Sequence, residues 1–263
     1  MSNAPTHIVK DAMDPARAAA MAATLGRPAP DGILPRFWHH AYFWEAHPPG
    51  DLGRDGHPRQ GVPPIPETGL PARMWAGGAV DWHAPLRLGE PARKVTRTLS
   101  LERKDGRGGP FALLRLEHRV EQAGRLCLRE RQDLVYRADP RPGQPRPDPP
   151  VAPEGEVTGG FAADPVLLFR FSALTFNSHR IHYDAAYATG VEGHSGLVVH
   201  GPLLAEALVH AAPEARRFEY RATAPLMAGE RADILRAGDR LVVRGPGGRA
   251  CMEARVGRDP LRD

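Results

Sequence analysis

One short segment brings together side chains that can hold a water molecule and take a proton from it. Asn177, His179, His182 and Asp184 follow the apolar run from Val166 to Phe171. His179 and His182 are three residues apart and Asn177 precedes His182 by five, so a helical turn would gather their side chains. Histidine can act as a base near neutral pH, whereas an amide orients a water but removes no proton. The segment therefore predicts His182 as the base and Asn177 as the residue that positions the water.

A metal site is the alternative use of this segment, because His179, His182 and Asp184 are all potential ligands. Their spacing differs from the H-E-x-x-H pattern of zinc-binding helices. We therefore expect no metal. A lone histidine near a core is more often structural than catalytic, so the catalytic prediction depends on the cluster as a whole.

A glycine introduces the next predicted helix, which runs from Pro202 to about Ala211. It is Gly201, in the sequence Val-Val-His-Gly-Pro. A glycine at a helix N-terminus exposes a backbone N–H and lets a ligand approach closely. Such a group can polarise a thioester carbonyl and stabilise an enolate oxygen. The alternative is that Gly201 only begins the helix.

The first half of the chain reads as helices followed by an antiparallel meander. Alanine-rich Pro15 to Leu25 predicts a helix that ends at Gly26, and the aromatic run from Leu34 to Trp44 predicts a second, buried one. Alternating residues then predict strands at Lys94 to Arg103, Phe111 to Val120 and Leu126 to Tyr136.

The second half has a similar pattern. A strand is expected through Phe171, then the polar turn, a short helix from Asp184 to about Gly190 and the helix from Pro202. Four further strands are expected, near Arg217 to Ala222, Asp233 to Arg236, Arg240 to Arg244 and Ala250 to Val256.

Two sequence matches indicate an internal duplication. Ala84 to Glu90 recurs as Ala224 to Glu230, and Gly124 to Cys127 recurs in the same order as Gly248 to Cys251. Asp139 to Pro153 contains seven prolines, which predicts an extended linker between the copies. We expect an α+β fold of the double hot-dog type, two tandem units in which a sheet wraps a helix: residues 1–138, a linker at 139–156, and residues 157–263.

Composition narrows the class of protein. The chain has 263 residues, 41% of them hydrophobic, and a net charge of +4 without a continuous basic block, which argues against nucleic acid as a partner. Scattered arginines suit a phosphorylated small ligand. No signal-peptide or membrane-spanning run is visible, so a soluble, cytoplasmic protein without membrane contact is expected. Cys127 and Cys251 lack CxxC spacing and read as reduced core residues.

At this point a family resemblance can be stated. F-S-A-L-T-F-N-S-H-R-I-H-Y-D followed by G-L-V-V-H-G-P-L-L resembles the mesaconyl-CoA hydratase group of the MaoC-like double hot-dog hydratases and dehydratases. The segments L-G-R-D-G-H-P, R-M-W-A-G-G and Q-D-L-V-Y-R of the first half are also similar, so the resemblance spans nearly the whole chain. In the wider family an aspartate and a histidine five residues later hold the water. The aspartate position falls on Asn177 and the histidine on His182.

The resemblance implies reversible addition of water to an α,β-unsaturated acyl-CoA, most simply a branched dicarboxylic one such as mesaconyl-CoA or itaconyl-CoA. The family's oxyanion amide falls on Gly201, and His200 beside it would contact the substrate. Arg180 would meet the substrate carboxylate, with an outward structural salt bridge as the alternative. Met74 and Trp75 of the first half would wall the acyl pocket, with burial in the ordinary core as the alternative for Trp75. The first half would cover the substrate with a degenerate site of its own, and two double hot dogs could associate as a homodimer. The coenzyme A thioester is the substrate, and no cofactor is needed.

Three other functions fit the same residues. The nearest is dehydration of 3-hydroxyacyl thioesters on acyl-carrier protein in fatty acid synthesis. A hot-dog thioesterase is the second. The third is a non-catalytic acyl-CoA-binding subunit, in which Asn177 marks lost catalysis.

Overall fold

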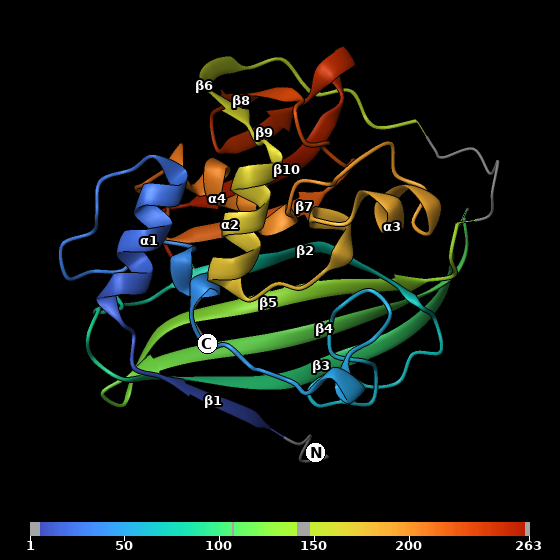
Figure 1. The fold of residues 1–263 in the computed structure, drawn as a ribbon. Helices are drawn as coiled ribbons and strands as arrows, with labels where there is room; N and C mark the ends of the chain where they lie inside the picture. The colour runs from blue at the N-terminus through green and yellow to red at the C-terminus, as the bar shows by residue number, and fades with distance from the viewer. Residues whose placement is uncertain (1–5, 107, 141–147, 261–263) are drawn as a thin grey trace.

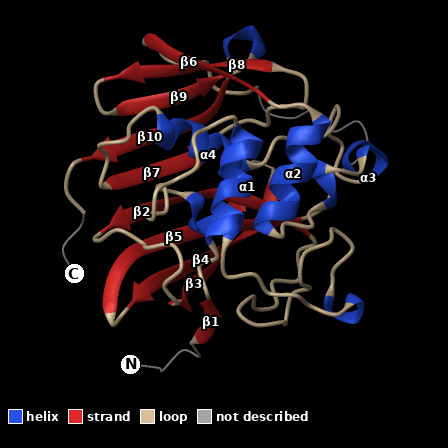
Figure 2. Cartoon of the chain, turned by 60° about the vertical axis from the view of Figure 1, so that its left-hand side comes forward, coloured by secondary structure: helices blue, strands red, loops and turns tan. Residues whose placement is uncertain are grey.

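The protein is built on one antiparallel sheet of ten strands with its helices gathered on one face (Figures 1 and 2). The computed structural model describes residues 6–106, 108–140 and 148–260. The α-helices are α1 (Pro15–Leu25), α2 (Pro165–Thr175), α3 (Ala185–Gly190) and α4 (Gly201–His210). The strands are β1 (His7–Asp11), β2 (Ala72–Trp82), β3 (Ala92–Gly106), β4 (Gly109–Gln122), β5 (Arg125–Arg137), β6 (Glu156–Ala162), β7 (Arg217–Ala222), β8 (Arg231–Ala237), β9 (Arg240–Arg244) and β10 (Ala250–Gly257).

The strand order is symmetric about the centre of the sheet. It runs β1-β3-β4-β5-β2-β7-β10-β9-β8-β6, so each half contributes five strands in the same order outward from the β2–β7 pair. That central pair is antiparallel, with Val80 opposite Phe218. Gly77 and Gly78 of β2 permit it, because a Cβ on either would meet backbone or the Tyr220 side chain at 2.6 Å or less.

The repeated sequence elements occupy matching places. Asp14 caps α1 and Asp164 caps α2, each directly before a proline. The repeated turns match as well, because the Gly89 N–H donates to the carbonyl that precedes the first cap, and the Gly229 N–H to the carbonyl that precedes the second, both at 2.8 Å. The duplication inferred from sequence therefore corresponds to a repeated three-dimensional unit.

Helix α4 is the central helix of the second unit. Its residues Leu203, Leu204, Ala205, Leu208 and Val209 are buried, and it packs on β7, β9 and β10. Helices α1 and α2 pack against each other on the same side of the sheet (Figure 2). This arrangement fixes the N-terminus of α4 next to the loop that follows α2.

Two predicted elements differ from the structure. The apolar run through Phe171 belongs to helix α2 and not to a strand; Val166 and Phe169 are exposed, so the run is not the buried strand that its composition suggested. The run from Leu34 to Trp44 is buried over most of its length, but it forms only a 3-10 turn at Trp38–Ala41, between left-handed residues Phe37 and Phe43.

The first unit therefore has no counterpart of α4 among its described residues. Strand β6 was not predicted. Residues 141–147 of the proline-rich segment lie outside the described residues. No helix in the described part of the chain is long and apolar enough to cross a membrane.

Candidate active site

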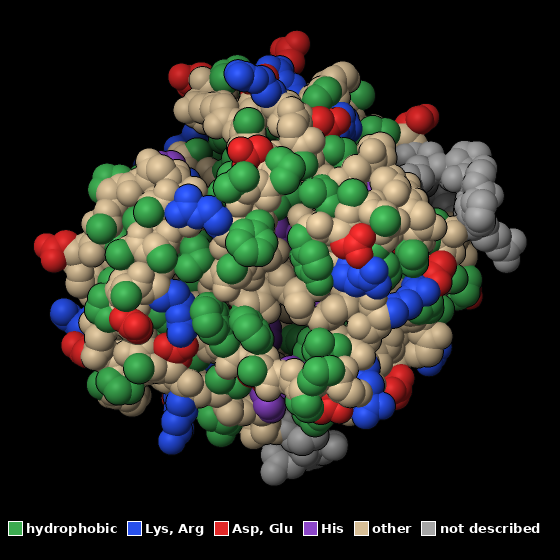
Figure 3. Space-filling model, viewed as in Figure 1, with side chains coloured by type: hydrophobic (Ala, Val, Ile, Leu, Met, Phe, Trp, Pro, Cys, Tyr) green, Lys and Arg blue, Asp and Glu red, His purple; other side chains and the backbone are tan. Residues whose placement is uncertain are grey.

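A cavity of about 850 Å³ contains most of the residues singled out from the sequence. Asn177, His182, Gly201, Met74 and Trp75 all line it. Its walls come from β2 of the first unit and from the α2–α4 segment and β10 of the second. On the face seen in Figure 3, histidine side chains are visible among apolar ones at the centre of the molecule. The polar turn and the predicted acyl wall therefore share one space.

The His182 ring is held in one tautomer. It ends a 3-10 turn, Arg180–His182, and its Nδ1 lies 2.7 Å from the carbonyl oxygen of Val198. A carbonyl only accepts, so Nδ1 carries the proton and Nε2 keeps its lone pair. Burial lowers the pKa of His182 well below its usual range, and the neighbouring His200 and His179 rings lower it further. His182 is therefore a neutral imidazole with its basic nitrogen unbonded to any described residue.

His200 supports this ring and does not reach the cavity, contrary to the expectation that it contacts substrate. It is fully buried, its Nε2 is hydrogen-bonded to Ser172 Oγ at 2.7 Å, and its ring stacks on His182 with centroids 3.6 Å apart. Burial lowers its pKa to about 3. A neutral ring stacked behind His182 fixes the orientation of the base and adds no charge to it.

Asn177 and His179 complete the turn. The Asn177 Oδ1 accepts the backbone N–H of His179 at 3.0 Å, and the His179 ring donates from Nε2 to Glu192 Oε1 at 3.0 Å. Burial raises the pKa of Glu192, but the hydrogen bonds from His179 and His194 outweigh it and lower that pKa to about 2. Asp184 lies away from these groups, because it caps α3 and pairs with Arg180. The three-ligand metal set considered from sequence is therefore not assembled.

Gly201 begins α4 and lines the cavity. Its backbone N–H makes no hydrogen bond to any residue in the described ranges, and Pro202 follows it. A Cβ at Gly201 would lie 2.5 Å from Cε3 of Trp75, whose ring in turn stacks on Tyr220 at 4.5 Å. Only glycine lets the indole and the helix start lie this close. The N–H is a free donor at the positive end of a helix dipole.

Arg180 does not line the cavity, contrary to the expectation from sequence. Its guanidinium pairs with Asp184 at 2.6 Å and lies over the Tyr187 ring at 4.3 Å. The cavity instead contains Arg73 of β2, for which the described residues provide no ion pair or hydrogen bond through its side chain. An unpaired guanidinium in a partly buried pocket is a natural site for a carboxylate.

A residue that sequence reasoning missed as a site residue, His57, also lines the cavity. It stands on the loop Gly53–Pro58 of the first half, far from the second-half motif in sequence. Its Nδ1 donates to Asp55 Oδ2 at 3.0 Å, and its ring lies 4.6 Å from that of His179. The aspartate–histidine pair two residues apart was visible in the sequence, but only the tertiary contact places it here.

Among the residues that the structure describes, two sets of side chains have donor atoms close enough to hold a metal ion. Asp55, His57 and His179 form one, and His39, His40 and Glu130 the other; within each set the atoms lie within 4.8 Å of one another. Each set already contains an internal histidine–carboxylate hydrogen bond. These bonds satisfy the carboxylates without an ion.

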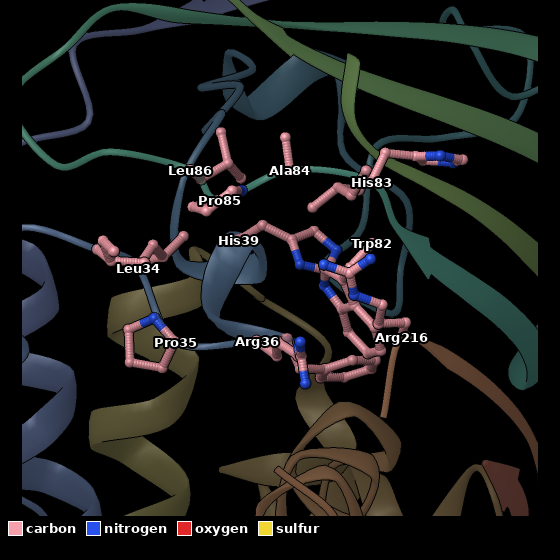
Figure 4. Close-up of a pocket in the computed structure, with 13 residues that line it drawn as sticks. Leu34, Pro35, Arg36, His39, Trp82, His83, Ala84, Pro85, Leu86 and Arg216 are labelled. Carbon is pink, nitrogen blue, oxygen red and sulfur yellow. The ribbon is translucent and has the colours of Figure 1, made fainter. Parts of the chain in front are cut away.

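A smaller cavity of about 160 Å³ occupies the matching place in the first unit (Figure 4). There the Leu34 N–H donates to Leu86 O, just as the Val199 N–H donates to Leu226 O at the larger cavity. Two residues after Val199 the larger cavity has Gly201 with its free N–H, whereas two residues after Leu34 the smaller cavity has Arg36. At this position the described part of the first unit therefore has no counterpart of the Gly201 N–H.

Comparison with known proteins agrees with this geometry. Residues 37–228 match the family model of hydroxyacyl-thioester dehydratase type 2. The chain is 42% identical over 268 residues to a mesaconyl-C(4)-CoA hydratase of Chloroflexus aurantiacus, covering 95% of this chain and 94% of that protein. It is 25% identical to the mitochondrial hydroxyacyl-thioester dehydratase type 2 of Schizosaccharomyces pombe, covering 73% and 74%.

Solved structures show the same fold. HtdX of Mycobacterium tuberculosis superposes with a TM-score of 0.70 at 19% identity, over 98% of this chain and all of that one. Another protein of that organism, described as having a double hot-dog fold, superposes with a TM-score of 0.56 at 16% identity, over 97% and 96%. The double hot-dog prediction is thereby confirmed. With its site and its relatives in agreement, the chain belongs to the hydroxyacyl-thioester dehydratase type 2 family and is a hydro-lyase.

Proposed function

We propose that this protein catalyses the reversible addition of water to an α,β-unsaturated acyl-CoA, with a branched dicarboxylic acyl group as its substrate. One observation carries the proposal. A neutral imidazole whose tautomer is fixed, His182, shares a cavity with the free N–H of Gly201 at the start of α4. A base for water and a donor for a thioester oxygen are the two groups that this reaction requires.

The reaction follows from these positions. The thioester carbonyl accepts a hydrogen bond from the Gly201 N–H, which makes the β-carbon electrophilic. His182 Nε2 takes a proton from water as the water oxygen bonds to that carbon and the electron pair of the double bond moves into an enolate. The imidazolium then returns the proton to the α-carbon, so the base is regenerated. Asn177 positions the water through its amide.

The low pKa of His182 suits this cycle. A base that is neutral before the reaction and returns its proton within it does not stay charged in a buried site. His200, stacked behind it and also neutral, keeps the ring facing the cavity.

Arg73 takes the role that sequence reasoning gave to Arg180. It lies two residues before Trp75 on β2, and alternate strand residues point to the same face, which is the face that packs on Gly201. Burial lowers the pKa of His57 and raises that of Tyr136, and the positive charge of Arg73 acts to lower both, so the guanidinium lies near both side chains. A substrate carboxylate beside the hydrated carbon would meet it there. The mesaconyl-C(4)-CoA hydratase named above supports this choice of acyl group.

The two halves would divide the work. Residues 157–263 carry the base and the oxyanion donor, whereas residues 1–138 cover the acyl group with Met74 and Trp75 and hold a degenerate site. Residues 139–156 would link them. No redox group or metal enters any of the steps above, and coenzyme A arrives as part of the substrate.

The test is hydration of mesaconyl-CoA by wild-type enzyme and by His182→Asn. Asparagine can still donate to Val198 O, but it has no atom at the place of Nε2. We expect kcat to fall by about 100- to 10,000-fold, the usual contribution of a general base. His210→Gln, an exposed change on the same helix as Gly201, serves as control. Turnover by His182→Asn close to that of the control would remove the imidazole from the mechanism.

A second candidate is dehydration of 3-hydroxyacyl groups on acyl-carrier protein; the name of the matching family supports dehydration of a hydroxyacyl thioester and does not specify the carrier. It uses the same site in reverse. Parallel assays with CoA and carrier-protein thioesters distinguish the two, because the preferred carrier shows the higher kcat/KM. Measuring released thiol in the same samples tests for thioester hydrolysis.

A further inference from the structure

We propose that His57, carried on a loop of the first half, is a second catalytic residue that accepts the other hydrogen of the attacking water. The inference rests on the proposed hydratase function. It assigns to an imidazole of one half the task that an aspartate beside His182 would otherwise perform in the other half.

His57 is built as a hydrogen-bond acceptor. Asp55 accepts both the ring Nδ1–H, at 3.0 Å, and the backbone N–H of His57, at 3.1 Å. Because a carboxylate only accepts, the ring must carry its proton on Nδ1 and present a bare Nε2. That nitrogen makes no hydrogen bond to any residue within the described ranges, and the side chain lines the cavity. A base oriented by a carboxylate is a recurring catalytic arrangement.

The loop that carries His57 is fixed to the loop that carries His182. The Arg180 N–H donates to Asp55 O at 2.8 Å, and Ser178 Oγ donates to Gly56 O. Gly56 has a φ of +92°, and a Cβ there would lie 2.0 Å from the carbonyl oxygen of Ser178. The two loops touch backbone to backbone, so His57 is held in register with the base and does not merely hang over the cavity.

The site also needs a second hydrogen-bond acceptor for the water, which His57 can provide. A water that gives one hydrogen to His182 has a second hydrogen to donate. Asn177 has already committed Oδ1 to the backbone N–H of His179, and what remains of its amide is chiefly the donor Nδ2. His57 supplies an imidazole acceptor in the same cavity as His182, and the His179 ring lies 4.6 Å from that of His57 and 5.5 Å from that of His182.

The protonation states agree with this role. Burial lowers the pKa of His57 to about 3, with the charge of Arg73 as the next cause, while the pKa of Asp55 lies near 2. The pair is therefore a neutral imidazole and an ionised carboxylate at neutral pH. Such an imidazole accepts a hydrogen bond and does not hold a proton, so His182 alone takes and returns the proton and the atom balance of the hydration is unchanged.

Three variants test the inference, each measured with mesaconyl-CoA and crotonyl-CoA. His57→Asn keeps an amide that can reach Asp55 but has no atom near the place of Nε2. His57→Gln extends an amide oxygen toward that place. Asp55→Asn can present its NH₂ to Nδ1 and so turn the ring to the tautomer with a protonated Nε2. His210→Gln is again the control, and melting temperature checks that each variant is folded.

We expect kcat to fall by about 100-fold for His57→Asn and Asp55→Asn with little change in KM, because a misplaced water is lost from the transition state. We expect His57→Gln to recover about tenfold of that loss. Equal impairment of His57→Asn and His57→Gln, or activity of His57→Asn within about twofold of wild type, would overturn the role of His57. If that second result accompanies an inactive His182→Asn, the hydratase function stands without His57; a wild-type enzyme inactive on every enoyl-CoA would overturn both.

Discussion

The contact between Gly201 and Trp75 allows a quantitative prediction. A methyl group added at Gly201 would lie 2.5 Å from Cε3, 3.0 Å from Cζ3 and 3.5 Å from Cδ2 of the indole. Carbon–carbon van der Waals contacts begin at about 3.5 Å, so the closest pair of atoms overlaps by about 1 Å. Something must therefore move when Gly201 is replaced by alanine.

The indole has little freedom to yield. It stacks on Tyr220 with centroids 4.5 Å apart and interplanar angle 19°, and the Tyr220 hydroxyl donates to buried Glu130. Overpacking of this kind costs about 1–3 kcal/mol. For a chain of this size we expect the melting temperature of Gly201→Ala to fall by roughly 2–12 °C. Activity should fall by at least about tenfold, because the same displacement moves the N–H that meets the thioester oxygen.

A double-mutant cycle isolates the contact. Trp75→Leu removes the atoms that the new methyl would strike, so Gly201→Ala should be much less destabilising in that background than in wild type. Calorimetric melting gives the coupling, and kcat/KM for mesaconyl-CoA gives the effect on the N–H. A Gly201→Ala enzyme that melts and turns over like wild type would refute the close approach. Equal destabilisation in both backgrounds would show that the strain lies elsewhere.

Two further predictions concern charge. Arg73→Met should lower kcat/KM for mesaconyl-CoA by roughly 10- to 150-fold more than for crotonyl-CoA, which is the contribution of a charge-assisted hydrogen bond. Arg180→Met is the control and should leave the ratio of the two kcat/KM values unchanged. Equal losses on both substrates in Arg73→Met would rule out the carboxylate role. Acidification from pH 7.5 to 5.5 should lower the melting temperature, because the pKa values of His57 and His200 are about 3 and that of His118 is about 4. The unfolded chain, with histidine near about 6.5, binds more protons than the folded one in this range, so stability present above that value is lost as pH falls. A melting temperature that is constant or rises toward pH 5.5 would contradict this.

Local signals predicted much of this fold. Alternating residues gave the meander β3–β5, and alanine content with a terminal glycine gave α1, whose C-cap Gly26 has a φ of 64°. The internal repeat predicted two similar units in tandem. These features depend on the nearest neighbours in the chain, which a sequence displays directly.

The errors arose where local composition was ambiguous. A six-residue apolar run fits a strand or a helix, and Phe171 was assigned to the wrong one. The deciding signal was the Asp164–Pro165 start, which matches the Asp14–Pro15 start of α1. The aromatic run of the first half was predicted to be a buried helix, but aromatic side chains do not specify a helix. Positive φ values at Phe37 and Phe43 end the 3-10 turn on both sides.

The candidate site likewise has features that local spacing signals and features that depend on tertiary contacts. The i, i+4 spacing of Arg180 and Asp184 on a turn already signalled an ion pair within the segment, and that pair keeps Arg180 from the cavity. In contrast, His57 and Arg73 reach the cavity through the pairing of β2 with β7 and the docking of one loop on another. No spacing rule reports contacts between residues more than a hundred positions apart.

The β2–β7 pair has a consequence for how the enzyme can move. Five successive residue pairs join the two units edge to edge through β2 and β7. The two units therefore cannot separate by a hinge motion at the centre of the sheet. Any conformational change that admits a bulky thioester must be confined to the loops and helices that cover the sheet. The continuous sheet then keeps the active-site groups from the two halves of the chain aligned throughout each turnover.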